Sequence, residues 1–257
     1  MDFFLYIMIF MMGTVFGSFF TLAVYRIPLK RDITHERSFC PKCNHRLEFL
    51  DLIPIISYIA LGGKCRYCKE KIRIRYLLLE MISGIVFLIS YLTINMKFPN
   101  YEINKIIYYV SFVLMYVTIA IVIGIDNEYK KINLKVVLFG VICQMMYIVY
   151  LYIFEKNINI YRYGIYILLI LILFIFNKLV KRQVYFLEII LFIIYCALCL
   201  DIKYMMILLI VSITIQSILE FIKRINKSKN IKLFNYGTIL GICMIAITII
   251  KNYYIYS

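Results

Sequence analysis

The chain has 257 residues, of which 64% are hydrophobic and only 17% are charged, and its formal net charge is +15 at pH 7. This composition excludes a soluble globular protein, because the few polar side chains cannot cover the apolar surface that one core would leave exposed. In a membrane protein the positive charge indicates which loops face the cytoplasm rather than a nucleic-acid partner, and we expect no nucleic acid to bind.

Long apolar runs recur along the whole chain. A membrane-spanning helix needs about 20 mostly apolar residues. Eight such runs, give or take one, lie at about 3–25, 77–96, 106–125, 135–154, 163–180, 184–200, 204–222 and 233–250. The sequence therefore predicts an all-α fold, a polytopic transmembrane helical bundle of about eight spans in a lipid bilayer. The first run lacks a basic segment before it and is too long for a signal peptide, so we expect it to be retained.

The chain is predicted to have three parts. Residues 1–25 form the first transmembrane helix, residues 26–76 a polar loop, and residues 77–257 a helical bundle. With eight spans, the loops rich in Lys and Arg all fall on one side of the membrane; they are 26–75, 130–131, 178–182 and 223–232. The positive-inside rule then predicts that this side is cytoplasmic and that both termini lie outside. A general bias of the sequence toward Lys would explain the total positive charge, but it would not explain why the basic loops alternate with nearly neutral ones.

The polar loop at residues 26–76, called the cysteine loop below, contains two Cys-x-x-Cys motifs. They are Cys40-Pro-Lys-Cys43 and Cys65-Arg-Tyr-Cys68. Two residues between thiolates let a tight turn direct both sulfurs at one ion, and two such turns complete the four-sulfur shell that zinc favours. A redox pair is the alternative, while a cytoplasmic location argues against structural disulfides. We expect a structural zinc ion, since four protein sulfurs leave no open position for catalysis.

The other four cysteines lie within apolar runs. They are Cys143, Cys196, Cys199 and Cys243. Small polarizable side chains pack well in such helices, so we expect all four to be part of the core.

Several short motifs, in one order along the first 85 residues, carry a resemblance to a known family. They are Gly17-Ser18-Phe19, Arg26-Ile27-Pro28, Arg37-Ser38-Phe39-Cys40-Pro41-Lys42-Cys43, Asp51-Leu52-Ile53-Pro54-Ile55-Ile56-Ser57-Tyr58, Gly62-Gly63-Lys64-Cys65-Arg66-Tyr67-Cys68, Ile74-Arg75-Tyr76 and Glu80. Together they resemble the N-terminal region of bacterial type IV prepilin peptidases. The rest of the bundle resembles that family more weakly.

The resemblance implies a membrane aspartic endopeptidase of the bacterial cytoplasmic membrane. Its members cleave the basic leader of type IV prepilins or pseudopilins at the cytoplasmic face. Many members then methylate the new N-terminus from S-adenosylmethionine. The sequence shows no glycine-rich cofactor loop, so no residues are assigned to that second step beyond the cysteine loop as a whole.

Aspartic proteolysis needs two carboxyl groups that share a proton. Asp126 ends the third apolar run in Ile125-Asp126-Asn127-Glu128, which resembles the first catalytic motif of the family, with Asn133 where a proline is usual. The resemblance therefore implies that Asp126 is catalytic. Without it, a carboxylate that caps a helix end is the simpler interpretation.

Glu188 is the second predicted catalytic residue. The second family motif, Gly-x-Gly-Asp, is missing; if Glu188 occupies the Asp position, then Tyr185 and Leu187 replace the glycines. A carboxylate within a membrane span is expensive enough to suggest a function by default. A Glu hydrogen-bonded within the bundle is an equal alternative. Glu128 is a second possible partner for Asp126. Because it follows Asp126 by only two residues, its side chain would point to another face of the helix.

Two other functions remain open from the sequence. A catalytically inactive homologue that binds pilins or assembly partners would explain the missing glycines. A transporter or channel would explain a charge inside a span, but one such residue and the absence of an internal repeat make this a weak hypothesis.

Overall fold

The computed structural model describes residues 2–33, 37–96, 102–154, 161, 164, 168, 184–226 and 235–256. Its helices are α1 (Asp2–Arg26), the short 3-10 helix η1 (Phe49–Asp51), α2 (Ile56–Ala60), α3 (Arg75–Thr93), α4 (Ile103–Tyr129), α5 (Leu134–Phe154), α7 (Val184–Cys199), α8 (Ile202–Asn226) and α9 (Tyr236–Tyr256). The only extended pairings in the described part of the chain are two isolated β-bridges. The predicted all-α fold is therefore confirmed.

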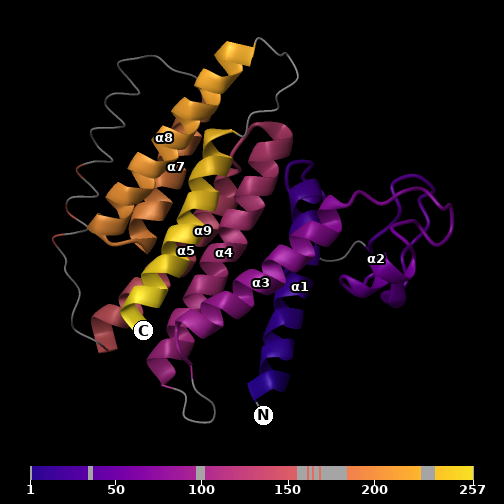
Figure 1. Ribbon diagram of the computed structural model, residues 1–257, viewed down its shortest axis with the longest axis horizontal. Coiled ribbons are helices and arrows are strands. Elements are labelled where there is room, and N and C mark those ends of the chain that lie inside the picture. Colours follow the sequence, from indigo (N-terminus) through magenta and orange to yellow (C-terminus); the bar gives the residue numbers. More distant parts are fainter. Residues whose placement is uncertain are drawn as a thin grey trace. The chain divides into compact units, whose positions relative to one another are not determined.

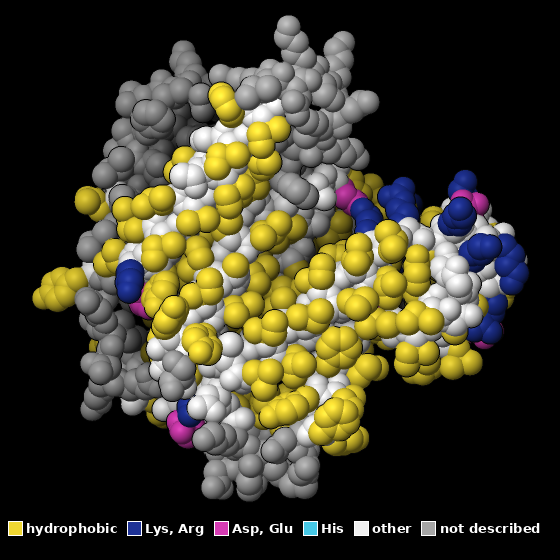
Figure 2. All heavy atoms as spheres, viewed as in Figure 1, with side chains coloured by type: hydrophobic (Ala, Val, Ile, Leu, Met, Phe, Trp, Pro, Cys, Tyr) yellow, Lys and Arg dark blue, Asp and Glu magenta, His cyan; other side chains and the backbone are white. Residues whose placement is uncertain are grey.

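Six of the described helices are long and apolar enough to cross a membrane, namely α1, α3, α4, α5, α8 and α9. Each coincides with one of the predicted runs. The run at 184–200 corresponds to α7, which has 16 residues. The run at 163–180 lies outside the described residues, apart from two isolated positions. Figure 2 shows hydrophobic side chains along the visible faces of the helices, as contact with lipid requires. The chain is a multi-pass membrane protein.

The chain divides into two compact units, residues Met1–Tyr101 and Glu102–Ser257. In the first unit, α1 packs closely against α3 (Figure 1). Gly13 and Gly17 stand one turn apart on α1, and a Cβ at either position would lie within 3 Å of the α3 backbone. Small residues at this spacing let two membrane helices approach closely. The cysteine loop joins the two helices.

The second unit is a bundle in which α4 packs against both α5 and α9 (Figure 1). The helices α7 and α8 complete it, through contacts of α7 with α5 and of α8 with α9. Its fully buried side chains include Ile119, Val122, Tyr195, Leu240 and Met244. By contrast, α5 exposes most of its apolar side chains, which lipid would cover.

The turn between α4 and α5 explains one departure from the family motif. Lys130 ends α4 with a left-handed backbone (φ 53°). The side-chain oxygen of Asn133 then accepts a hydrogen bond from the Lys135 N–H at 3.0 Å. An Asn side chain that bonds the backbone two residues on is a typical N-cap. Asn133 therefore starts α5 at the position where the family usually has a proline.

Candidate functional site

The two Cys-x-x-Cys motifs form two turns with the same backbone hydrogen bonds. In each turn the first cysteine donates its N–H to the carbonyl five residues later and accepts from the N–H four residues later. The four bonds are Cys40 N–H to His45 O (3.0 Å), Asn44 N–H to Cys40 O (2.8 Å), Cys65 N–H to Glu70 O (2.8 Å) and Lys69 N–H to Cys65 O (3.1 Å). An isolated β-bridge flanks each turn. The loop thus contains one local structure twice.

These turns bring four sulfur atoms together. The Sγ atoms of Cys40, Cys43, Cys65 and Cys68 all lie within 4.8 Å of one another, and Cys40 Sγ is 3.8 Å from Cys68 Sγ. A tetrahedral zinc ion with Zn–S bonds of about 2.3 Å requires sulfurs about 3.8 Å apart. The cluster could therefore hold a metal ion such as zinc, and its geometry fits a closed, structural site.

The thiols differ in acidity. Burial opposes ionisation of Cys40, but backbone N–H groups of Cys43 and Lys42 and the thiols of Cys43 and Cys65 outweigh it and lower the pKa of Cys40 to about 7. At Cys68 the backbone at Glu70 favours the thiolate, but burial and the three neighbouring sulfurs raise its pKa to about 11. Four thiols so close cannot all ionise without a cation among them.

Three charged residues hold the cysteine loop in place. Arg26, at the end of α1 and only 2% exposed, donates to the carbonyls of Asp32 (3.0 Å) and Arg37 (3.2 Å). Glu80, buried on α3, accepts the Ile55 N–H at 2.8 Å. Asp51 pairs with Arg66 Nε at 2.7 Å and so joins η1 to the second cysteine turn.

A second cluster surrounds Asp126, which is fully buried in the last turn of α4. Its Oδ2 accepts two hydrogen bonds from Thr238, one from the backbone N–H (2.8 Å) and one from Oγ1 (2.9 Å). The Asn235 amide donates to the backbone carbonyl of Asp126. Thr238 lies in the first turn of α9, where backbone N–H groups have no partner within the helix. Asp126 therefore caps the N-terminus of a helix far away in sequence.

Gly237 makes this contact possible. A Cβ at this position would lie 2.9 Å from Asp126 Oδ2, closer than side-chain atoms tolerate. From the sequence alone no role is assigned to Gly237, Thr238 or Asn235, because their contacts with Asp126 join segments more than 100 positions apart.

The other predicted carboxylates are less well defined. Glu188 lies in α7, but its side chain is outside the described part of the structure. Glu128 is exposed, unlike Asp126, so the two lie on different sides of α4. The described atoms therefore identify the surroundings of Asp126 but not its partner carboxyl group.

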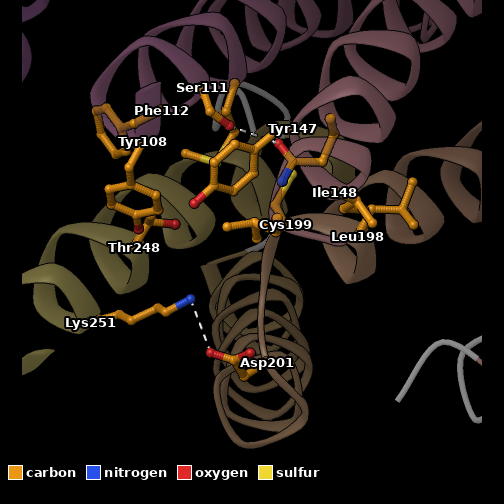
Figure 3. A pocket seen from close by; sticks show the side chains of 13 residues that line it. Tyr108, Ser111, Phe112, Tyr147, Ile148, Leu198, Cys199, Asp201, Thr248 and Lys251 are labelled. Atoms are coloured by element: carbon orange, nitrogen blue, oxygen red, sulfur yellow. Dashed lines mark hydrogen bonds and ion pairs between the residues drawn. The ribbon is translucent and has the colours of Figure 1, made fainter. Parts of the chain in front are cut away.

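A separate cavity of about 150 Å³, lined by polar and apolar side chains, lies in the second unit. It is lined by residues of α4, α5, α7 and α9 (Figure 3). Two of its lining residues form an ion pair, the Lys251 ammonium with Asp201 at 3.0 Å. Tyr108 lines this cavity from α4 and stands eighteen positions before Asp126 on the same helix. Eighteen residues of an α-helix span about 27 Å. The cavity and Asp126 therefore lie at opposite ends of the bundle.

A comparison with family models matches residues 11–94 to the Bacterial Peptidase A24 N-terminal domain. The matched segment includes both cysteine turns, Arg26 and Glu80, and so it contains the residues that hold the loop. It ends before Asp126 and Glu188.

Several known proteins that match about a third of the chain are named "Prepilin leader peptidase/N-methyltransferase". The protein of Myxococcus xanthus is 38% identical over 81 residues, which is 32% of this chain and 24% of the relative. That of Vibrio cholerae is 36% identical over 92 residues, 32% of this chain and 36% of the relative. That of Bacillus subtilis is 38% identical over 79 residues, which is 31% of this chain and 32% of the relative. The resemblance to prepilin peptidases is confirmed over about a third of the chain.

The alignments thus span about a quarter to a third of the length of these relatives. No solved structure matches the chain.

Proposed function

We propose that the protein is a membrane aspartic endopeptidase that removes the basic leader from type IV prepilins or pseudopilins at the cytoplasmic face of the bacterial inner membrane. The A24 N-terminal domain and the name shared by its relatives support this proposal. The observation that carries it in the second unit is Asp126, a fully buried carboxylate at a helix end, held by hydrogen bonds from α9.

The proposed chemistry uses Asp126 and Glu188 as a pair that shares one proton. The ionised carboxylate takes a proton from water, whose oxygen attacks the scissile carbonyl carbon. The protonated carboxyl group first donates to the carbonyl oxygen, and the leaving amine then takes a proton as the C–N bond breaks. Such a pair requires two carboxyl groups at the same depth in the membrane.

Helix geometry supports a shared depth. Both α7 and α9 reach this cavity, at Cys199 and Lys251. Glu188 stands eleven residues before Cys199, about 16 Å along α7, and Thr238 thirteen residues before Lys251, about 20 Å along α9. These similar spacings support the proposal that Glu188 pairs with Asp126.

The test is cleavage of a prepilin by the purified protein in liposomes, comparing wild type with Asp126→Asn, Glu188→Gln and Glu188→Asp. We expect both neutral variants to lose cleavage and Glu188→Asp to retain some, because it keeps the carboxyl group on a shorter side chain. Cleavage that survives Glu188→Gln would remove Glu188 from the site.

A catalytically inactive homologue that binds pilins is the second candidate function. Tyr185 and Leu187, in place of the two family glycines, favour it. It predicts no cleavage by folded wild-type protein of a substrate that a control peptidase cuts, together with retention of that prepilin on the immobilised protein.

We further propose that Cys40, Cys43, Cys65 and Cys68 bind a structural zinc ion and that the cysteine loop lies in the cytoplasm. The basic neighbours Lys42, Lys64 and Arg66 would offset the double negative charge of a zinc tetrathiolate. A reporter fused within the loop should read as cytoplasmic, and an external signal would reverse the topology.

Methylation of the new N-terminus from S-adenosylmethionine is proposed only from the names of the relatives. Mass spectrometry of the cleaved pilin, with and without S-adenosylmethionine, tests it: an added methyl group supports the activity, and unmodified product alone speaks against it.

A further inference from the structure

Five apolar side chains of the cysteine loop form an exposed patch, called the apolar patch below. They come from η1, α2 and the residue after η1. The exposed fractions are 82% for Phe49, 59% for Leu50, 39% for Leu52, 55% for Ile56 and 67% for Ile59. An exposed cluster of large apolar side chains marks a surface that another apolar phase covers.

The loop holds this patch rigidly on both sides. Asp51 ties η1 to the second cysteine turn through Arg66. Glu80 ties the start of α2 to the transmembrane helix α3 through the Ile55 N–H. Ile55 has a positive φ of 62°, a conformation that is a genuine outlier for a β-branched residue and persists only where the surroundings impose it. The orientation of the patch relative to α3 is therefore determined by specific contacts.

The position of the loop places the patch at a membrane surface. Both α1 and α3 are long and apolar enough to cross the membrane, and the loop leaves α1 at Arg26 and enters α3 at Arg75. At this junction Ile74 is 62% exposed and Leu78 48% exposed, as expected of lipid-facing residues. Figure 2 shows hydrophobic side chains along the lower edge of the loop in this view, and Lys and Arg along its right-hand and upper margins.

The charge of the loop suits one kind of membrane surface. Residues 26–76 contain twelve Lys and Arg against five Asp and Glu, a net charge of +7. Anionic lipid head groups attract basic segments next to a membrane helix, and long basic side chains reach head groups from a position above buried apolar ones. A soluble protein partner would explain the apolar patch but not its place beside lipid-facing residues.

We infer that the apolar patch inserts into the lipid leaflet beside α1 and α3, while the basic side chains of the loop contact anionic head groups. The cysteine loop is then anchored to the membrane surface, and insertion of Phe49, Leu50 and α2 determines its position relative to the bilayer. This inference depends on the membrane spans and not on the proposed peptidase activity.

The chain contains no tryptophan, so a single introduced tryptophan reports on its own surroundings. We would compare Phe49→Trp with Lys42→Trp, an exposed position on the first cysteine turn, in vesicles of phosphatidylcholine with and without phosphatidylglycerol. Lipids brominated on the acyl chain quench fluorescence from within the bilayer, and acrylamide quenches it from water. Ile59→Trp is the second patch position if Phe49→Trp does not fold.

The expected result is several-fold stronger quenching of Phe49→Trp than of Lys42→Trp by brominated lipid, with the reverse order for acrylamide, and a larger difference when phosphatidylglycerol is present. Equal access of acrylamide to both tryptophans would overturn the inference. So would a Phe49→Trp signal that neither quencher reaches, because that result means that protein, from this chain or a second copy, covers the patch.

Discussion

Thr238 donates two hydrogen bonds to one oxygen of Asp126, from its backbone N–H at 2.8 Å and from its hydroxyl at 2.9 Å. The two residues lie on α9 and α4, and both are almost fully buried. The contact orients the Asp126 carboxylate and satisfies an N–H at the start of α9. One side chain thus serves both the stability of the bundle and the proposed reaction.

Thr238→Val removes the hydroxyl donor without changing the size of the side chain. A hydrogen bond to a charged group contributes about 1.5–3 kcal/mol, so we expect leader cleavage to fall about 10- to 150-fold and the melting temperature in detergent to drop. Thr238→Ser keeps the hydroxyl and should retain most of the activity. Equal rates for the two variants would show that the hydroxyl does not position Asp126.

Gly237→Ala and Gly241→Ala form a matched pair one turn apart on α9. A Cβ at Gly237 meets Asp126 Oδ2 at 2.9 Å, whereas one at Gly241 meets only side-chain carbons of Ile123 and Ile119. Gly237→Ala should therefore displace the carboxylate and abolish most cleavage. Gly241→Ala should cost about 1–3 kcal/mol of stability through overpacking, while the surviving folded protein keeps its activity. Similar specific activities would contradict this assignment.

Cys40→Ser should remove bound zinc, because the loss of one of four thiolate ligands opens the coordination shell. We expect zinc, measured by mass spectrometry of the purified protein, to fall from about one ion per chain to a small fraction. Cys243→Ser, in α9, is the control and should bind zinc as the wild type does. Wild-type protein without zinc would refute the metal site.

Glu80→Ala should release the cysteine loop from α3. Removing the acceptor leaves the Ile55 N–H without its partner, at a cost of about 1–3 kcal/mol, and the strained backbone at Ile55 can then relax. Hydrogen exchange of residues 53–60 should accelerate. Glu80→Gln retains a carbonyl acceptor and should preserve most of the protection; unchanged exchange in Glu80→Ala would show that the loop is held elsewhere.

The Lys251–Asp201 pair should stabilise the far end of the bundle. Because Lys251 is only 11% exposed and Asp201 is 43% exposed, Asp201→Asn should lower stability more than Lys251→Met. The first variant leaves a largely buried ammonium without its carboxylate, whereas the second leaves a carboxylate that water still reaches. A double-mutant cycle in detergent should give a coupling of about 1 kcal/mol. Cleavage by these variants should be unchanged once they are folded, since Tyr108, which lines the same cavity, stands about 27 Å before Asp126 along α4.

The amino-acid sequence was sufficient for the parts of the protein that depend on neighbouring residues. Apolar runs of about 20 residues predict membrane helices because the bilayer has a fixed thickness, and six of these runs are long apolar helices in the described structure. The spacing within Cys40–Cys43 and Cys65–Cys68 predicts sulfurs that converge, because each turn closes through its own backbone hydrogen bonds.

Contacts between distant segments were decided only by the tertiary structure. Thr238 and Asp126 are 112 positions apart, and Glu80 reaches Ile55 across 25 positions. Hydrophobicity identifies a span but leaves its rotation about its axis and its depth open, since lipid accepts any apolar face. Packing of α9 against α4 determines both, and so only the folded bundle shows which polar side chains surround Asp126.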